Sequence, residues 1–349
     1  MTENSPTNPP PAAHRRRPRY PGKNPRRFED KYKEHAPARF PETIAKVIAS
    51  GKTPAGSHRP VMVAEVLDAL TPKPRDVVVD CTLGYGGHAQ ALLQRIQPGG
   101  QLIGLDSDPI ELPRTEARLR ALGFDGSAFR AHRGNFAGLA QRLAGLGLGG
   151  ADAIFADLGV SSMQIDDPAR GFAMKLDGPL DMRMNPHRGQ PASLFLQSLS
   201  ARALADLLAG NSDEPNARQI ADALAGKSFT TTTALAAAVR ATLPRKAEDE
   251  LERTVRRVFQ AVRIAVNDEF GALEMLLRHL PACLRPGGRV AFLTFHSGED
   301  RRVKKSFEAG LRAGDYAEIS PTVTRPSPEE CGANPRATSA KLRWARKAA

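Results

Sequence analysis

The chain is poor in cysteine and lacks long apolar runs. Its three cysteines, Cys81, Cys283 and Cys331, are far apart and show no C-x-x-C spacing, which argues against a disulfide framework or a thiolate metal site. The histidines also lack metal-ligand spacing, so we expect no metal. No stretch reaches the roughly eighteen consecutive apolar residues of a transmembrane helix, and the N-terminus lacks the apolar core of a signal peptide. We therefore expect a cytoplasmic protein with no membrane partner.

Positive charge is what the sequence has in excess. The formal net charge is +12, and residues 1–59 hold 13 basic and 5 acidic residues, so most of the excess lies near the N-terminus. This balance favours a polyanionic partner such as nucleic acid. Aromatic residues make up only 5% of the chain, too few for a broad base-stacking platform. We interpret residues 1–55 as a disordered basic tail, either an RNA-contacting arm or only a solubilising extension.

From about residue 60 onward, short β-rich runs alternate with helical periodicity, which is typical of a parallel α/β sheet. Strands are predicted at 77–80, 101–106 and 151–157, and another begins at Phe129. A further buried strand is expected after a turn at 285–288.

The interval before that last strand has a different character. It begins with turn-forming residues and continues with several short helical segments, so we predict an inserted helical subdomain at 168–253. The α/β domain is then split into two parts, 56–167 and 254–349. One long helix is predicted over 248–280, and it returns the chain to the sheet.

A loop with three glycines follows the first predicted strand, in the stretch VVVDCTLGYGGHAQALL at 77–93. Gly84, Gly86 and Ala89 fit the dinucleotide fingerprint G-x-G-x-x-G/A, with Asp106 about twenty positions further on. A nicotinamide-dependent oxidoreductase would use such a loop. The loop alone therefore leaves the class of ligand open.

Acidic residues close three of the predicted strands, namely Asp80, Asp106 and Asp157. In an open α/β sheet, ligands bind at these carboxyl ends of the strands. Carboxylates disfavour a pyrophosphate but suit a cationic ligand that carries hydroxyl groups. S-adenosylmethionine has that profile, since it combines a sulfonium, an amino group and a ribose without phosphate. The acids therefore favour the methyl donor over a dinucleotide.

Seven long runs of this sequence occur in the order found in the RsmH, or MraW, family, which the chain resembles from about residue 57 to 345. The runs are HRPVMVAEVLDAL, DCTLGYGGHA, GLDSDP, DLGVSSMQIDDPARGFAMKLDGPLDMRMNP, RRVFQAVRIAVND, RPGGRVAFLTFHSGEDRRVK and NPRATSAKLR. That family comprises bacterial methyltransferases that modify the exocyclic amine of a cytosine in small-subunit ribosomal RNA, at the decoding centre.

The resemblance implies a fold, a cofactor and a partner. The fold is an α/β, Rossmann-like S-adenosylmethionine-dependent methyltransferase sheet with an inserted all-helical subdomain. The cofactor is S-adenosyl-L-methionine, and the partner is small ribosomal subunit RNA in an assembled or nearly assembled particle. A homodimer stays open.

The resemblance also implies particular site residues. Gly86 and Gly87 would let the backbone approach the methionine part of the donor, and Phe136 would flank the adenine. Asp157 and His296 are the catalytic candidates, the first as the acceptor for the amine N–H groups and the second as a proton shuttle or base contact. The full set of implied cofactor contacts is Gly86, Gly87, His88, Asp106, Phe136, Asp157 and Gln164.

We expect phosphate contacts from basic residues on the long helix, after the run FHSGED and near the C-terminus. Gly298 in that run departs from the family, which commonly has a larger apolar residue there. The basic residues expected to contact phosphates are Arg257, Arg263, Arg301, Arg302, Arg336, Lys341 and Arg343, with Arg256 beside them.

Two other functions stay open on the residues alone, an NAD(P)-dependent oxidoreductase and a catalytically silent RNA-binding assembly factor.

Overall fold

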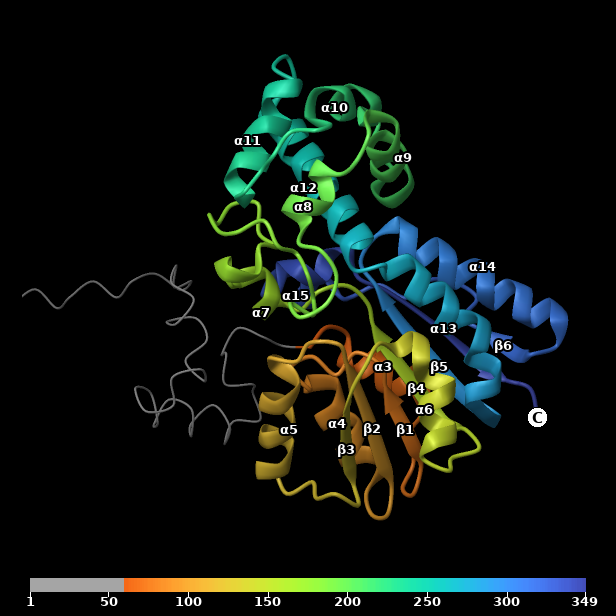
Figure 1. Cartoon of the computed structure of the whole chain (residues 1–349). Helices are drawn as coiled ribbons and strands as arrows, with labels where there is room; N and C mark the ends of the chain where they lie inside the picture. The colour runs from red at the N-terminus through yellow and green to blue at the C-terminus, as the bar shows by residue number, and fades with distance from the viewer. Residues whose placement is uncertain (1–59) are drawn as a thin grey trace, which may run out of the picture.

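The computed structural model describes residues 60–349, so the tail predicted at 1–55 lies outside the described residues. The centre of the fold is a seven-stranded sheet in the order β3-β2-β1-β4-β5-β7-β6 (Figure 1). Strands β1 to β5 are parallel to their neighbours in this set, and β7 is antiparallel to both β5 and β6. This is the doubly wound, Rossmann-like architecture predicted from the sequence. The strands are β1 (Val77–Asp80), β2 (Gln101–Asp106), β3 (Phe129–Arg133), β4 (Ala151–Asp157), β5 (Leu284–Thr294), β6 (Tyr316–Ile319) and β7 (Lys341–Lys347).

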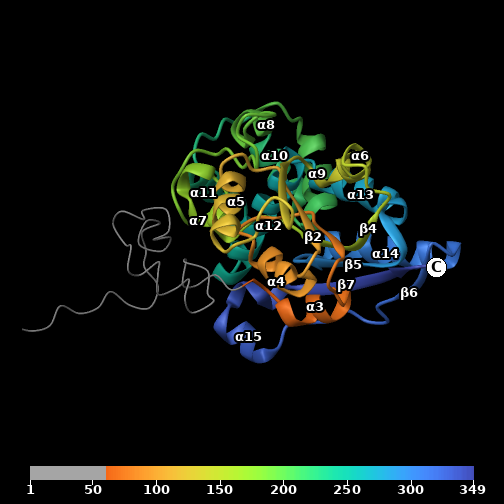
Figure 2. The same ribbon diagram turned by 90° about the horizontal axis from the view of Figure 1, so that it is seen from below.

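Apolar cores cover both faces of the sheet. Val78 and Phe155 belong to one core, while their chain neighbours Val79 and Ile154 belong to the other, because successive strand residues point to opposite faces. Burial on both faces explains why the strands are almost continuously apolar. Figure 2 shows α3 and α4 on one side of the sheet and α6 and α13 on the other. The first core contains α3 (Val63–Leu70), α4 (Gly87–Ile96) and α5 (Glu111–Ala121); the second contains α6 (Leu139–Gly145), α13 (Glu269–Cys283) and α14 (Ser297–Ala313).

A third apolar core lies in the helices that follow β4. It runs from Phe172 to Val262, and Figure 1 shows its helices gathered apart from the sheet. The boundary expected at residue 253 falls inside α12, whose apolar face still packs into this core at Val255 and Val262. We therefore propose that the helical unit extends through α12. Its helices are α8 (Ala192–Gln197), α9 (Ala201–Ser212), α10 (Ala217–Leu224), α11 (Thr232–Thr242) and α12 (Glu248–Val266).

Short elements border the strand ends and the helical unit. They are η2 (Phe136–Gly138), α7 (Ser162–Asp166), η3 (Pro168–Arg170), α15 (Pro328–Ala333) and η4 (Pro335–Ser339).

The long helix predicted over 248–280 is in fact two helices, and this prediction was wrong. The chain breaks between α12 and α13 at Asp268, which has a left-handed φ of 48°. The break is fixed by Asn267, whose Oδ1 accepts the Met184 N–H at 2.7 Å and whose Nδ2 donates to the Met182 carbonyl at 2.7 Å. A tertiary clamp onto the loop of the helical unit therefore overrides the continuous helical periodicity.

The C-terminal part of the sheet also differs from the prediction. The turn expected at 285–288 is part of β5, which starts at Leu284 and has a register shift against β4 between Ala151 and Ala153. Strands β6 and β7 were not predicted. Their mixture of basic and apolar residues hides the alternation that marks a strand, and β7 is placed by antiparallel pairing with β5.

Across residues 60–349, no three His, Cys, Asp or Glu side chains are grouped closely enough to hold a metal ion. Cys81 and Cys283 are buried as free thiols, and Cys331 is free and partly exposed. In the same residues, no helix has both the length and the apolarity needed to cross a membrane.

Candidate active site

A cavity of about 1220 Å³ opens at the carboxyl ends of the parallel strands. Asp106 at the end of β2 and Asp157 at the end of β4 both line it, together with the glycine loop, α7 and parts of α12 and α13. Asp80 at the end of β1 lies beneath its floor, only 1% exposed, where its Oδ1 accepts the Thr82 N–H at 3.1 Å. Asp80 thus acts on the cavity through its charge rather than by contact.

The glycine loop is tied to the end of β2. The Gly84 N–H donates to Asp106 Oδ2 at 2.7 Å, and Gly86 caps α4 with a left-handed φ of 76°. A β-carbon at Gly86 would lie 2.8 Å from Thr115 Cγ2, and one at Gly87 would lie 2.8 Å from Pro60 Cγ. Packing between protein segments therefore requires both glycines, and the close ligand approach that the resemblance implies stays a prediction.

Asp106 presents a carboxylate that is already oriented by the backbone. Its Oδ2 accepts the Gly84 N–H and its Oδ1 accepts the Asp108 N–H at 2.8 Å. Burial raises the pKa of Asp106 to about 6, although these two backbone bonds oppose the shift. Each carboxylate oxygen can accept a second hydrogen bond, which leaves Asp106 suited to hold the hydroxyl groups of a ribose.

His88 is a buried, neutral histidine. Its Nε2 lies 2.9 Å from the Val61 carbonyl, and its ring packs on Phe155 with 4.6 Å between centroids. Burial lowers the pKa of His88 to about 4, so the ring is uncharged at neutral pH. Its Nδ1 lies 3.7 Å from Asp157 Oδ2, which places His88 behind the Asp157 carboxylate.

Asp157 carries the most perturbed carboxyl of the cavity. Its Oδ1 is buried without a hydrogen-bond partner among the described residues, whereas its backbone N–H is held by Thr82 Oγ1 at 2.6 Å. Burial, reinforced by the charges of Asp80 and Glu299, raises the pKa of Asp157 to about 8. A buried acceptor with no partner is costly, so this oxygen is suited to receive a hydrogen bond from a bound molecule.

His296 faces the same cavity from the start of α14. Its Nε2 lies 3.0 Å from Glu299 Oε1, and its Nδ1 is buried with no partner in the described part of the chain. Although burial opposes ionisation, the hydrogen bond from His296 and the charge of Arg263 keep the pKa of Glu299 below its usual range. A β-carbon at Gly298 would lie 2.7 Å from Phe270 Cζ, so the family's larger residue would require Phe270 to move.

The other two predicted cofactor contacts also line the cavity. Phe136 begins η2, lines the cavity and packs against the second core, and its contact with adenine stays a prediction. Gln164 is engaged at both ends: its Oε1 accepts the Ser161 N–H at 2.9 Å and its Nε2 donates to Asp108 Oδ2 at 2.8 Å. Its geometry therefore favours an orienting role over direct contact with a ligand.

Three of the seven predicted phosphate contacts are mostly buried in ion pairs. Arg263 binds Glu269 through Nε at 2.8 Å, while Arg343 and Lys341 share Asp300 at 2.7 and 3.4 Å. Because a buried cation cannot reach a phosphate without breaking its pair, this geometry favours structural roles for the three residues.

The remaining four are more accessible and also lie beside carboxylates. Arg257 is 3.7 Å from Glu214 and Arg301 is 3.0 Å from Asp213. Arg302 and Arg336 form 2.8 and 2.7 Å pairs, with Glu274 and Asp166 respectively. Of these four, Arg336 lines the cavity, and exposed Arg256, another basic residue of α12, lines it as well.

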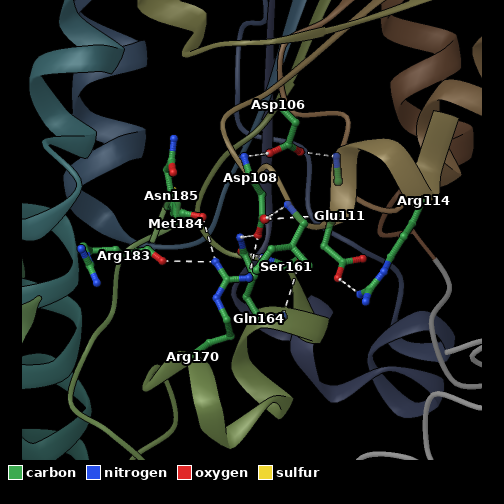
Figure 3. A network of polar contacts seen from close by, with 12 residues as sticks. Asp106, Asp108, Glu111, Arg114, Ser161, Gln164, Arg170, Arg183, Met184 and Asn185 are labelled. Carbon is green, nitrogen blue, oxygen red and sulfur yellow. Dashed lines mark hydrogen bonds and ion pairs between the residues drawn. The ribbon is translucent and has the colours of Figure 1, made fainter. Parts of the chain in front are cut away.

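Asp108 and Arg170 are the residues of this site that the sequence reasoning missed. They form a buried ion pair of 2.8 Å between the loop after β2 and the end of η3 (Figure 3). The only signal in the sequence is a second acid in the run GLDSDP, two positions after Asp106.

The fold and the cavity together define a class of enzyme. A Rossmann-like sheet places acids at the ends of β1, β2 and β4, and in the described part of the chain Asp157 Oδ1 has no hydrogen-bond partner. These features fit a donor with a sulfonium, an ammonium and a ribose. The chain is an S-adenosyl-L-methionine-dependent methyltransferase.

Comparison with known proteins identifies the family. The model of the MraW methylase family matches residues 55–348, and the chain belongs to that family. A relative named ribosomal RNA small subunit methyltransferase H 1, from Lachnoclostridium phytofermentans, is 47% identical over 344 residues, covering 96% of this chain and 93% of the relative. Ribosomal RNA small subunit methyltransferase H 2 from Alkaliphilus metalliredigens is 47% identical over 342 residues, covering 95% and 97%.

The match of the family model to residues 55–348 agrees with the resemblance seen from about residue 57 to 345. Because the two relatives cover 96% and 95% of the chain, their similarity also reaches into residues 1–55. Family membership also decides against the NAD(P)-dependent oxidoreductase.

We predict that donor affinity rises with pH between about 6 and 8.5. The carboxyls of Asp106, Asp80 and Asp157 have pKa values raised to about 6, 7 and 8, so each is protonated below its value and attracts the cationic sulfonium only above it. S-adenosylhomocysteine keeps the ammonium and the ribose but lacks the sulfonium charge. Calorimetry at several pH values should therefore show donor affinity rising relative to that of S-adenosylhomocysteine.

The ratio of the two affinities cancels the titration of the ammonium, which both ligands share. In Asp157→Asn, the rise of this ratio near pH 8 should be reduced, because the group with the highest of the three pKa values is gone. A ratio that stays constant with pH in the unmodified protein would contradict the predicted attraction between these ionised carboxylates and the sulfonium charge.

Proposed function

We propose that this enzyme methylates the exocyclic amine of one cytosine in small-subunit ribosomal RNA, at the decoding centre. The observation that carries the chemistry is Asp157 Oδ1 on the wall of the cavity, which has no hydrogen-bond partner within the described residues. The choice of RNA follows the relatives, which are named as small-subunit ribosomal RNA methyltransferases.

The cavity is large enough for a donor and a nucleobase together. Its volume of about 1220 Å³ exceeds the roughly 300–1,000 Å³ typical of small-molecule sites. Asp106 and Phe136 mark the donor region, whereas Met184 and Asn267 line the region next to the helical unit. A target base must be taken out of its stack to enter this second region, as in other enzymes that act on bases.

S-adenosylmethionine, when bound, supplies an activated methyl group on a sulfonium. The contribution of the chain is to hold the amine in line with that methyl and to keep water out. A cytosine amine is a poor nucleophile because its lone pair is delocalised into the ring. Asp157 Oδ1 accepts one amine N–H and favours a more nucleophilic, pyramidal nitrogen.

Proton transfer completes the step. As the amine nitrogen bonds to the methyl carbon and the carbon–sulfur bond breaks, the nitrogen must lose a proton, which Asp157 accepts. With its pKa raised to about 8, the ionised form of Asp157 is a stronger base than an ordinary carboxylate, and it becomes the main form above that pH. His296 Nδ1, also on the cavity wall, is buried and has no hydrogen-bond partner among residues 60–349, and it can accept the other amine N–H.

The surface around the cavity supports a ribosomal partner. Arg256 and Lys175 line the cavity and are exposed, Arg301 is exposed on α14, and Arg257 is partly exposed on α12. Such cations give sequence-independent contacts to phosphates, which position the RNA but do not read it. We propose an assembled or nearly assembled small subunit in the cytoplasm as the substrate, because a folded particle supplies the specificity that scattered surface cations lack. That two copies of this enzyme form a homodimer is a separate prediction.

A transfer assay tests this function. Tritiated S-adenosylmethionine is incubated with the enzyme and with small subunits that lack the modification, free small-subunit RNA, or large subunits. Label on assembled small subunits, with much less on free RNA and none on large subunits, is the expected result. A silent assembly factor would bind small subunits without transferring label, and the presence of Asp106 and Asp157 on the cavity wall argues against that alternative.

A further inference from the structure

We propose that Asp108 and Arg170 are positioning residues that couple the donor site to the acceptor side of the cavity. Asp108 is 1% exposed and Arg170 is 8% exposed, and 2.8 Å separates Asp108 Oδ2 from Arg170 Nη1. This inference rests on the proposed function, because it concerns how one cavity brings the donor and the RNA base together.

The Asp108 carboxylate accepts hydrogen bonds from the protein at both of its oxygens (Figure 3). Its Oδ1 accepts the N–H groups of Ile110 at 2.8 Å and Glu111 at 3.3 Å, where α5 begins. Its Oδ2 accepts Gln164 Nε2 and Arg170 Nη1, both at 2.8 Å. Because a carboxylate has about four acceptor sites, none is left for a ligand. Asp108 therefore acts through the groups that it holds.

On the donor side, the network begins at the ribose-binding acid. The Asp108 N–H donates to Asp106 Oδ1 at 2.8 Å, so the two acids share one short turn of backbone. Gln164 extends the network to the loop after β4, because its Oε1 accepts the Ser161 N–H at 2.9 Å. A change in the position of Asp106 is thus passed to the segment that follows Asp157.

On the acceptor side, the network ends in the loop of the helical unit. Arg170 Nη2 donates to the carbonyls of Arg183 at 3.2 Å and Met184 at 2.8 Å. The Met184 N–H in turn donates to Asn267 Oδ1 at 2.7 Å, at the junction of α12 and α13. Met184 and Asn267 both line the cavity. Arg170 therefore links the donor acid to the wall that faces the base.

The chemistry of this link makes it stiff. A guanidinium that is buried and bonded to a carboxylate and two carbonyls is strongly oriented, and removing one partner leaves an uncompensated buried charge. Donor binding at Asp106 is accordingly expected to order the 182–186 segment. A residue with a purely structural role would stabilise both sides without transmitting anything between them.

Hydrogen exchange on the full chain, with and without S-adenosylhomocysteine, separates the two possibilities. In the unmodified protein, the ligand should raise protection both in the glycine loop, 83–88, and in the 182–186 segment. In Asp108→Asn, protection of 83–88 should still rise, whereas protection of 182–186 should no longer respond. In methyl transfer, this variant should lose about 10- to 100-fold in kcat, with the donor KM changed by less than about threefold.

Two further variants keep the test decisive. Arg170→Lys preserves the charge but cannot bond Asp108 and both carbonyls at once, so it should weaken the response of 182–186; it replaces Asp108→Asn if that variant does not fold. Asp152→Asn is the matched control, because it breaks a 2.6 Å pair with Arg285 far from the cavity, and its response should be unchanged.

Two results would overturn the coupling. One is a 182–186 segment that does not respond to S-adenosylhomocysteine in the unmodified protein, and the other is a response retained in full by both Asp108→Asn and Arg170→Lys. Failure of the unmodified enzyme to methylate small subunits would instead count against the proposed function. The hydrogen-exchange experiment requires no RNA, so its result can be interpreted whether or not the enzyme methylates small subunits.

Discussion

Asp157→Ala is expected to lower kcat for methyl transfer by about 10²- to 10⁴-fold, the range typical for loss of a general base. The alanine removes both the acceptor for the amine N–H and the group whose pKa of about 8 fits it to take the proton. Single-turnover transfer of a tritiated methyl group to small subunits, at saturating donor and RNA, measures the effect. Binding of S-adenosylhomocysteine, followed by calorimetry, should change far less.

Asp157→Asn is the matched variant, because it keeps an acceptor oxygen in nearly the same place but cannot take up a proton. Its rate should fall between those of the unmodified enzyme and Asp157→Ala, which would separate orientation of the amine from proton transfer. Near-normal turnover by Asp157→Ala at saturating donor and RNA would remove Asp157 from the reaction.

Asp106→Ala should weaken binding of the donor and of S-adenosylhomocysteine by about 100-fold. A hydrogen bond to a charged group contributes roughly 1.5–3 kcal/mol, so losing the bonds to two ribose hydroxyls is enough for this effect. The substitution also frees the Gly84 and Asp108 N–H groups, which Asp106 holds in place. Calorimetric titration with S-adenosylhomocysteine gives the dissociation constant.

Asp76→Ala serves as the control for Asp106→Ala. Asp76 precedes β1, at the opposite end of the strands from the cavity, and its Oδ2 accepts the Lys73 N–H at 2.8 Å. Its removal should leave ligand affinity unchanged. An affinity of Asp106→Ala within about threefold of the unmodified value would place the ribose elsewhere in the cavity, since even one such bond is worth more than that.

The parallel half of the fold could be predicted from the sequence because local and tertiary preferences agree there. The strands at 77–80, 101–106 and 151–157 have the predicted bounds, since each is an apolar run closed by an acid where the strand leaves the sheet. The break at Asp268 could not be predicted, because it depends on Asn267 clamping a loop more than eighty residues away in sequence.

Part of the candidate site could also be predicted from the sequence, and part could not. Asp106 and Asp157 could be expected at the cavity because strand ends in a parallel sheet meet at one edge. The ion pairs of Arg263 with Glu269 and of Arg343 with Asp300 could not be foreseen from charge alone. The sequence does not show whether a basic side chain is solvated or buried beside a carboxylate, because that depends on how α13 and α14 pack on the sheet.

The central claim is tested most directly by identifying the methylated nucleoside. Small subunits lacking the modification are incubated with the enzyme and tritiated S-adenosylmethionine, and the RNA is then digested and mapped. The account predicts a single labelled cytidine in the decoding region, methylated on its exocyclic amine, with labelling slowed by at least about 100-fold when Asp157→Ala replaces the enzyme. Label on a ring carbon, on a ribose, or on a base other than cytosine would contradict it.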